Sequence, residues 1–187
     1  MSQTGNQTGS QSGTPAGAQT HPVRYPDWIC VGAQKAATTW LYQQFIGVPG
    51  VFLPAIKEIH YYSELCDKRV ARYSVRQRER KTTSTRSYWQ KVKFSVADRK
   101  TKRDRRLAEL EHLRSGAFDD NWYGGIFGFA REDDVCGEIC PSYMIMPQEG
   151  IDHVFRLNPD AKIIIIVRDP VARAWSHLRM THEPEKL

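Results

Sequence analysis

The chain has 187 residues, of which 40% are hydrophobic and 26% are charged. This length is typical of one domain and is sufficient to bury a hydrophobic core without disulfide bonds. The composition excludes a collagen-like, fully disordered or disulfide-scaffold protein. The longest apolar run, residues 163–167, is far too short to cross a bilayer.

The first residues carry no basic segment followed by an apolar run, so the sequence predicts no secretory signal. Four cysteines are present at positions 30, 66, 136 and 140. Cys136 and Cys140 are spaced C-x3-C, but no second pair of ligands has the spacing of a zinc ribbon. We therefore expect reduced thiols, no metal site and a cytoplasmic location.

The net charge of +6 is unevenly distributed along the chain. Residues 68–106 contain 16 Lys or Arg against 3 Asp or Glu, a local net charge of +13, which leaves −7 for the rest. Such a block attracts polyanions such as nucleic acid, anionic lipid or an acidic substrate. A solvated helical face explains the same composition, and the sequence leaves both interpretations open.

The predicted domain organisation follows from composition. Residues 1–20 have no charged side chain and are mostly Gln, Thr, Ser, Gly and Ala, so we predict a disordered tail over residues 1–22. One α/β domain is expected over residues 23–187. Within it, residues 64–118 form a basic and mainly helical insert.

Hydrophobic periodicity predicts strands that alternate with helices, which indicates a parallel sheet. The run at 161–167 is nearly all β-branched, as in a strand buried on both faces, and residues 58–62 are expected to be extended. The other predicted strands cover residues 28–31, 51–53 and 135–139, and the predicted helices cover residues 38–45, 148–157 and 170–178.

A candidate anion-binding loop follows the first predicted strand. Small residues, a lysine and two threonines lead into the next helix, whose N-terminal N–H groups and dipole favour a negative charge. The loop lacks the Gly-Lys-Ser/Thr of a Walker A motif. The residues expected to form the cradle are Gly32, Ala33, Gln34, Lys35, Ala36, Ala37, Thr38 and Thr39.

A second candidate anion-binding group follows the strand at residues 161–167. Arg168 lies just past its carboxyl end, where ligands bind in open α/β sheets, and a guanidinium suits phosphate. Ser176 lies about two helical turns later, so its hydroxyl is expected to face the same phosphate. Arg173 either joins this group or braces the helix, and a salt bridge with Asp169 is the alternative role for Arg168.

These segments resemble motifs of the sulfotransferases. The first resembles their 5′-phosphosulfate loop, close to G-x-x-K-[ST/A]-G-T-T-x-L, with Ala37 where that family usually has glycine. The second resembles their 3′-phosphate motif, roughly [IV]-x-R-[DN]-P-x-x-R-x-x-S. The matching residues are Gly32, Lys35, Thr38, Thr39 and Leu41 in the first motif and Arg168, Asp169, Pro170, Arg173 and Ser176 in the second.

Two further segments carry the same resemblance. Residues 137–143 are similar to the G-E-x-[TS]-P-x-Y segment of bacterial and glycan-modifying sulfotransferases, with Cys140 at the hydroxyl position. Residues 57–62 are similar to the K-E-x-H-[FY]-[FY] segment of the glycan-type enzymes. That resemblance implies Glu58 as general base, with His60 as second choice and Lys57 as a neighbouring site residue. Glu138 is expected to have a structural or substrate-orienting role.

The resemblance implies a three-layer, P-loop-like α/β fold whose central parallel sheet is flanked by helices. It also implies 3′-phosphoadenosine 5′-phosphosulfate as donor, with Lys35 neutralising the departing 5′-phosphate, and a hydroxyl or amine acceptor. The basic insert points to an acidic glycan as acceptor. Trp122 and Tyr123 are candidates to line the acceptor cleft, but their residue types favour core packing.

Family members typically continue beyond the 3′-phosphate motif with another strand, helices and a basic loop. A sheet without these elements exposes an edge and apolar surface, so we expect weak stability or association with a partner chain. Two alternative functions are kept. One is a non-enzymatic polyanion-binding protein, whose binding would fall steeply with salt. The other is a P-loop kinase, which would need magnesium-dependent phosphoryl transfer.

Overall fold

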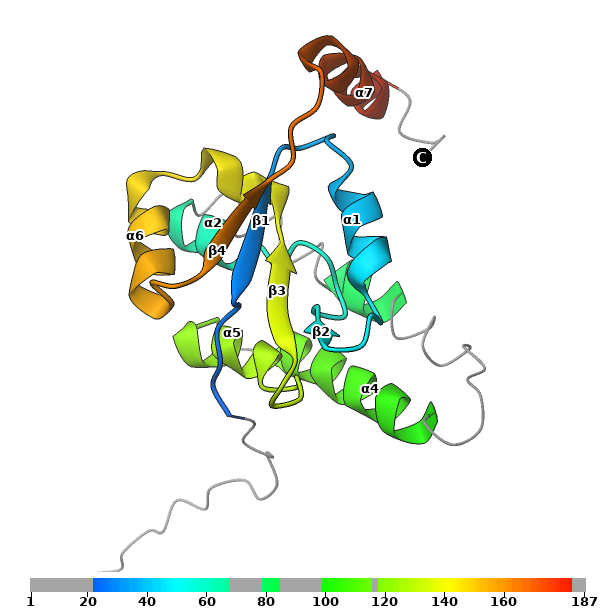
Figure 1. Cartoon of the computed structure of the whole chain (residues 1–187), viewed down its shortest axis with the longest axis vertical. Coiled ribbons are helices and arrows are strands. Elements are labelled where there is room, and N and C mark those ends of the chain that lie inside the picture. The colour runs from blue at the N-terminus through cyan, green and yellow to red at the C-terminus, as the bar shows by residue number, and fades with distance from the viewer. Residues whose placement is uncertain (1–21, 68–78, 85–98, 116–117, 183–187) are drawn as a thin grey trace, which may run out of the picture.

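The computed structural model describes residues 22–67, 79–84, 99–115 and 118–182 (Figure 1). The predicted tail at residues 1–22 lies almost wholly outside these ranges, as do large parts of the insert predicted at residues 64–118. None of the helices in the described ranges is both long and apolar enough to cross a bilayer.

Four parallel strands form the centre of the fold, in the order β2-β3-β1-β4. They are β1 (Trp28–Gly32), β2 (Val51–Phe52), β3 (Val135–Ile139) and β4 (Lys162–Ile165). Helices connect the strands, as parallel pairing requires. The predicted α/β class with a central parallel sheet is confirmed.

Helices cover both faces of the sheet (Figure 1). Alternate residues of β1 point to opposite faces, so Cys30 packs towards α1 (Thr38–Phe45), whereas Ile29 joins the larger core on the other face. The larger core also takes side chains from helices further along the chain. These are α2 (Tyr61–Cys66), α4 (Arg99–Ser115), α5 (Asp120–Phe127), the short 3-10 helix η1 (Pro141–Ile145) and α6 (Gln148–Leu157).

Close packing fixes the register of β1 against β3. Trp28 lies opposite Gly137, and a Cβ atom at position 137 would lie 2.1 Å from the Trp28 ring. Only glycine therefore lets the indole lie flat across the neighbouring strand. This contact places the carboxyl ends of β1 and β3 side by side, which is where the loops of interest begin.

The strand predicted at residues 161–167 is shorter and more exposed than expected. β4 ends at Ile165, and within the described ranges it pairs with β1 alone. Ile163 and Ile165 are 53% and 54% exposed, so the prediction of burial on both faces is wrong. The apolar run predicts a strand correctly, but whether that strand is buried depends on which elements pack beside it.

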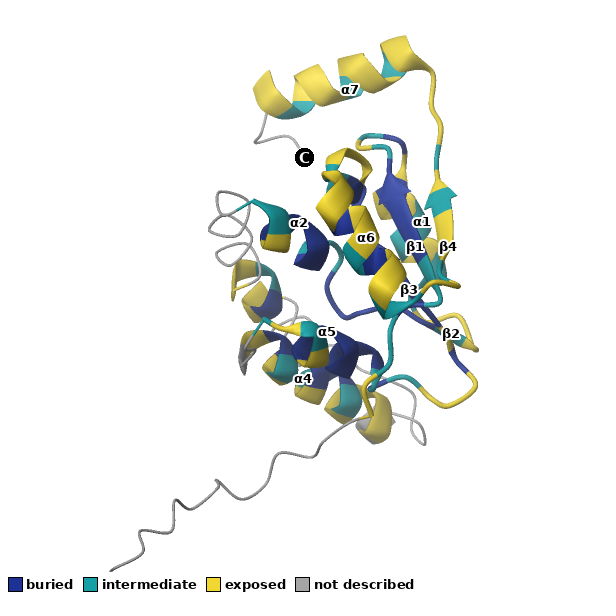
Figure 2. Ribbon diagram, turned by 90° about the vertical axis from the view of Figure 1, so that its left-hand side faces the viewer, coloured by how far each residue is buried: buried dark blue, intermediate teal, exposed yellow. Residues whose placement is uncertain are grey.

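The helix after β4 also lies open to solvent. α7 (Pro170–His182) extends four residues beyond the predicted end and has no buried residue, and Trp175 is 64% exposed. It lies beyond the carboxyl ends of the strands, away from the main body of the fold (Figures 1 and 2). Asp169 caps it by accepting a hydrogen bond from the Ala172 N–H at 2.8 Å.

The prediction of an extended segment at residues 58–62 is wrong. Glu58 and His60 have φ values of 64° and 65°, in the left-handed region, and α2 begins at Tyr61. Tyr61 and Tyr62 are both 1% exposed. Burying two consecutive aromatic side chains on one side of the chain requires a helical turn, because successive residues of a strand face opposite ways.

The basic helix α4 is anchored in the core rather than lying on the surface. Arg106 Nη1 donates to Leu53 O at 2.8 Å and to Glu109 Oε2 at 2.7 Å. The other oxygen of Glu109 accepts the Ala55 N–H, and Glu109 is fully buried. This buried ion pair fastens the insert to the segment that leads to Glu58.

We predict that Arg106→Ala lowers the free energy of unfolding by about 3–5 kcal/mol, because it leaves the Glu109 carboxylate buried without its cation. Urea denaturation measures the change. Arg103→Ala removes a largely exposed cation from the same helix and should change the free energy by less than about 0.5 kcal/mol. Equal effects of the two substitutions would contradict the anchoring role.

Candidate functional site

The backbone of the loop between β1 and α1 lies very close to the start of η1. Gly32 has a φ of +132°, and a Cβ there would lie 3.2 Å from the Pro141 carbonyl oxygen, so the position needs glycine. Lys35 and Ala37 adopt left-handed φ values of 65° and 66°. Ala37 is thus strained at the position where glycine would carry no penalty.

The two candidate anion-binding segments meet at this loop. Arg168 Nη1 donates to the Lys35 carbonyl oxygen at 3.0 Å, across 133 residues of sequence. Beside it, the Ala33 N–H donates to Ile166 O at 3.1 Å, and the Ile166 N–H donates to Gly32 O at 2.7 Å. The loop after β1 and the segment after β4 therefore form one surface at the carboxyl edge of the sheet.

Donors for an anion are concentrated here. Among the described residues, no side chain caps the N-terminus of α1, so its first N–H groups are available to a ligand. Lys35 and Arg168 add two cations. In this structure Lys35 Nζ lies 3.8 Å from Met180 Sδ, a weak acceptor on α7.

The remaining predicted phosphate ligands are less closely involved. Gln34 and the small residues Ala33 and Ala36 form the loop itself, and Thr38 is buried at the start of α1. Ser176 lies in α7 and is half-buried, and in the described part of the chain its side chain makes no hydrogen bond to the loop. Arg173 also lies in α7, exposed, and its side chain forms no ion pair among the described residues.

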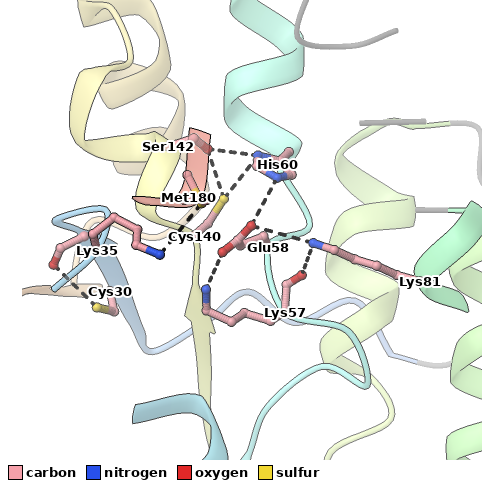
Figure 3. Close-up of polar contacts among 10 residues, drawn as sticks. Cys30, Lys35, Lys57, Glu58, His60, Lys81, Cys140, Ser142 and Met180 are labelled. Atoms are coloured by element: carbon pink, nitrogen blue, oxygen red, sulfur yellow. Dashed lines mark hydrogen bonds and ion pairs between the residues drawn. The ribbon is translucent and has the colours of Figure 1, made fainter. Parts of the chain in front are cut away.

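A cluster of charges surrounds Glu58 on the neighbouring loop (Figure 3). Lys57 Nζ donates directly to Glu58 Oε1. The second oxygen, Oε2, lies 3.6 Å from Lys81 Nζ and 3.8 Å from His60 Nε2. An extended segment over residues 58–62 would turn Lys57 away from Glu58, whereas the left-handed turns at Glu58 and His60 bring the side chains of Lys57, Glu58 and His60 together.

The carboxylate of Glu58 is stabilised in its ionised form. Burial alone would raise the pKa of Glu58, but its interactions with the Lys57, Lys81 and His60 side chains outweigh burial and hold the pKa below its usual value. Glu58 is therefore ready to accept a proton at neutral pH. In Figure 3 its side chain and that of Lys35 point towards one another across the end of β3.

His60 is oriented by hydroxyl and thiol groups on its other side. Its Nδ1 lies 2.9 Å from Ser142 Oγ, which lies 3.0 Å from Ser63 Oγ and 3.2 Å from Cys140 Sγ. Because Nδ1 contacts Ser142, the ring is oriented so that Nε2 faces Glu58. Burial raises the pKa of the Cys140 thiol well above its usual value, so it stays protonated and is a poor nucleophile.

Glu138 lies beneath this loop and is 1% exposed. Its two oxygens accept hydrogen bonds from Tyr123 Oη at 2.5 Å and Tyr143 Oη at 2.9 Å. Of the two roles left open by the sequence, this burial favours the structural one. Trp122 and Tyr123 are 5% and 0% exposed, so both pack in the core rather than lining a cleft.

Three residues of the site are not specified by any of the motifs, although Ser142 lies at an unspecified position of the segment 137–143. Lys81 comes from the basic insert, in the helical residues 79–84, and its only sequence signal is the local excess of positive charge. Ser63 and Ser142 are common residue types that become significant only where they meet His60. All four cysteines are described, and no disulfide joins them. No cluster of metal-ligating side chains is found among the described residues.

A parallel sheet with a candidate anion-binding loop after β1 and an arginine after β4 is the arrangement of an α/β protein whose ligand site lies at the carboxyl edge of the sheet. A family model described as the sulfotransferase family matches residues 26–186. The chain belongs to the sulfotransferase family.

One curated relative is the mouse (Mus musculus) heparan sulfate glucosamine 3-O-sulfotransferase 6. It is 32% identical over 79 residues, which are 41% of this chain and 23% of that protein. The match therefore spans about a quarter of the relative's length. No solved structure is significantly similar to the chain.

The buried carboxyl of Glu138 should make stability depend on pH. Burial raises its pKa from 4.5 to about 7, although two tyrosines donate to it. Between these values the unfolded carboxyl has lost its proton and the folded one keeps it. The free energy of unfolding should therefore fall as the pH rises through this window, by about 3 kcal/mol.

Urea denaturation at several pH values, compared with Glu138→Gln, isolates this contribution because the amide does not titrate. The wild type should lose stability relative to Glu138→Gln as the pH rises from about 4.5 to 7. Exposed Glu132→Gln is the control, and its profile should follow the wild type. A constant difference between wild type and Glu138→Gln would contradict the prediction.

Proposed function

We propose that the protein transfers a sulfuryl group from 3′-phosphoadenosine 5′-phosphosulfate to a hydroxyl or amine of an acceptor, with an acidic glycan as the acceptor class. One observation carries the proposal. Arg168 and the Lys35 loop meet at the carboxyl edge of the sheet, and the Glu58 side chain points towards this loop from the next one (Figure 3). Family membership supports the same reaction.

The residues present suit such a donor. The α1 N-terminus, free of a side-chain cap among the described residues, offers N–H groups to the 5′-phosphosulfate. Lys35 lies beside these N–H groups, and its ammonium would compensate the charge that develops on the departing 5′-phosphate. Arg168 would bind phosphate oxygens with the guanidinium nitrogens that the Lys35 carbonyl leaves available.

Glu58 would act as general base. Its carboxylate takes the proton of the acceptor hydroxyl or amine while the acceptor atom forms a bond to sulfur. The bond between sulfur and the bridging oxygen breaks, and 3′-phosphoadenosine 5′-phosphate leaves with the electron pair. Glu58 then releases its proton to water. His60, held by Ser142, would keep the carboxylate in place.

Charge supports an acidic acceptor. Lys57 and Lys81 lie at the candidate base, and the insert around Lys81 carries a net charge of +13 over residues 68–106. The mouse relative is named for a sulfated glycan, which supports the same class. We keep the cytoplasmic location expected from the sequence as part of the proposal.

The same basic insert supports a second candidate function, a polyanion-binding protein without catalysis. Such binding would survive loss of Lys35 and would fall steeply with salt. The site does not support the kinase alternative, because the loop between β1 and α1 lacks the Gly-Lys-Ser/Thr that would hold a magnesium nucleotide.

Calorimetry with 3′-phosphoadenosine 5′-phosphate tests the donor site. We expect wild-type binding in the micromolar range and a loss of about tenfold or more for both Lys35→Ala and Arg168→Ala, since each removes a charge-assisted contact to phosphate. Lys162→Ala removes an exposed lysine at the other end of β4 and should bind as the wild type does. A folded wild type that does not bind the nucleotide would exclude the proposal.

Glu58→Gln tests the base. Transfer of labelled sulfate to desulfated heparan fragments should fall by about 100-fold or more, because the amide accepts no proton, whereas nucleotide binding should stay unchanged. His60→Gln is the matched comparison and should have the smaller effect on transfer. If His60→Gln abolishes transfer and Glu58→Gln does not, His60 is the base.

A further inference from the structure

Lys81 connects the basic insert with the candidate base. Its Nζ donates to the Lys57 carbonyl oxygen at 3.0 Å and lies 3.6 Å from Glu58 Oε2. The lysine side chain is 34% exposed and that of Glu58 is 27% exposed. The pair therefore lies at the rim of the site, within reach of a bound molecule.

The groups that face Glu58 differ in their freedom to move away. Lys57 and His60 belong to the same loop as Glu58, and His60 is held by Ser142. Cys140, at the end of β3, is buried and keeps its thiol proton. Lys35, on the loop after β1, points towards Glu58 (Figure 3), but among the described residues no ion pair joins the two. Of the cations paired with Glu58 in this part of the chain, Lys81 is the one that comes from another element, the helical residues 79–84, and its side chain is flexible and partly exposed.

A base surrounded by cations is ionised but weak. Each positive neighbour stabilises the carboxylate and so opposes its uptake of a proton, whereas general-base catalysis improves as the proton affinity rises towards the working pH. Both lysines oppose proton uptake in the free protein. Removing one of them would strengthen the base.

We propose that Lys81 is a positioning residue that changes partners, leaving Glu58 for an anionic group of the bound acceptor and thereby freeing the base. This inference rests on the proposed function. It adds a physical reason why the enzyme would prefer an acidic acceptor to an uncharged one. An acceptor with a carboxylate or sulfate near its reacting hydroxyl draws Lys81 away and so activates Glu58. With an uncharged acceptor, Lys81 stays paired with Glu58 and the base remains weak. Acceptor charge then acts on the rate of transfer as well as on binding.

Carbon-13 NMR of protein labelled at the glutamate carboxyls tests the inference, with the Glu58 signal assigned by its loss in Glu58→Gln. Lys81→Met should raise the pKa of Glu58 by about one unit. Arg80→Met makes the same charge change at the neighbouring exposed position and should leave the Glu58 pKa within about 0.3 units. Lys81→Arg keeps the charge and should titrate as the wild type does.

A heparin-derived tetrasaccharide supplies the anionic probe. At the highest concentration used, it should raise the Glu58 pKa in the wild type and in Arg80→Met, and have a much smaller effect in Lys81→Met. An unchanged Glu58 pKa in the wild type overturns the proposal, and so does an equal rise in Lys81→Met. A Glu58 that titrates identically in the wild type and Lys81→Met without the probe overturns it as well.

A kinetic measurement separates this inference from the proposed function. Lys81→Met should reduce the ratio of kcat/KM for sulfated over uncharged acceptors and move the acid limb of the pH profile upwards, with nucleotide binding intact. If the wild type does not bind the nucleotide, the proposed function itself is wrong. If Lys81→Met binds the nucleotide and transfers sulfate with the same ratio of kcat/KM for sulfated over uncharged acceptors as the wild type, only the role of Lys81 is wrong.

Discussion

The site depends above all on one buried carboxyl group, that of Glu138. Its hydrogen bonds from Tyr123 and Tyr143 join β3 to α5 and to η1, and it also accepts the N–H of Ile59, between the two left-handed residues of the Glu58 loop. A polar group at this depth is costly unless every partner is present. Glu138 therefore holds the Glu58 loop in a single, strained conformation.

A second buried carboxylate holds the other side of the same segment. Glu109 accepts the Ala55 N–H and pairs with Arg106, which donates to the Leu53 carbonyl. Two core carboxylates from distant parts of the chain thus fix the segment from Leu53 to Ile59. The strain at Glu58 is balanced by hydrogen bonds that a purely apolar core would not provide.

The sequence predicted those parts of the structure that depend on local pattern. The strand at Trp28 and the helix ending at Leu157 follow from periodicity. The resemblance to the sulfotransferases, rather than periodicity, implied that Arg168 and the Lys35 loop belong to one site, and Arg168 donates to the Lys35 carbonyl. The bend at His60 was missed, because its cause is hydrogen bonding to residues far away in the sequence. Lys81 was missed because nothing near it in the chain distinguishes it from its basic neighbours.

The hydrogen bond from Arg168 to the Lys35 carbonyl spans 133 residues, and this separation bears on when the site forms. Contacts between distant positions close late, since a long loop must be ordered before they form. During synthesis the β1 loop leaves the ribosome long before β4 and Arg168 exist. We therefore expect the surface that these two loops form to assemble late, after the tyrosine core beneath it.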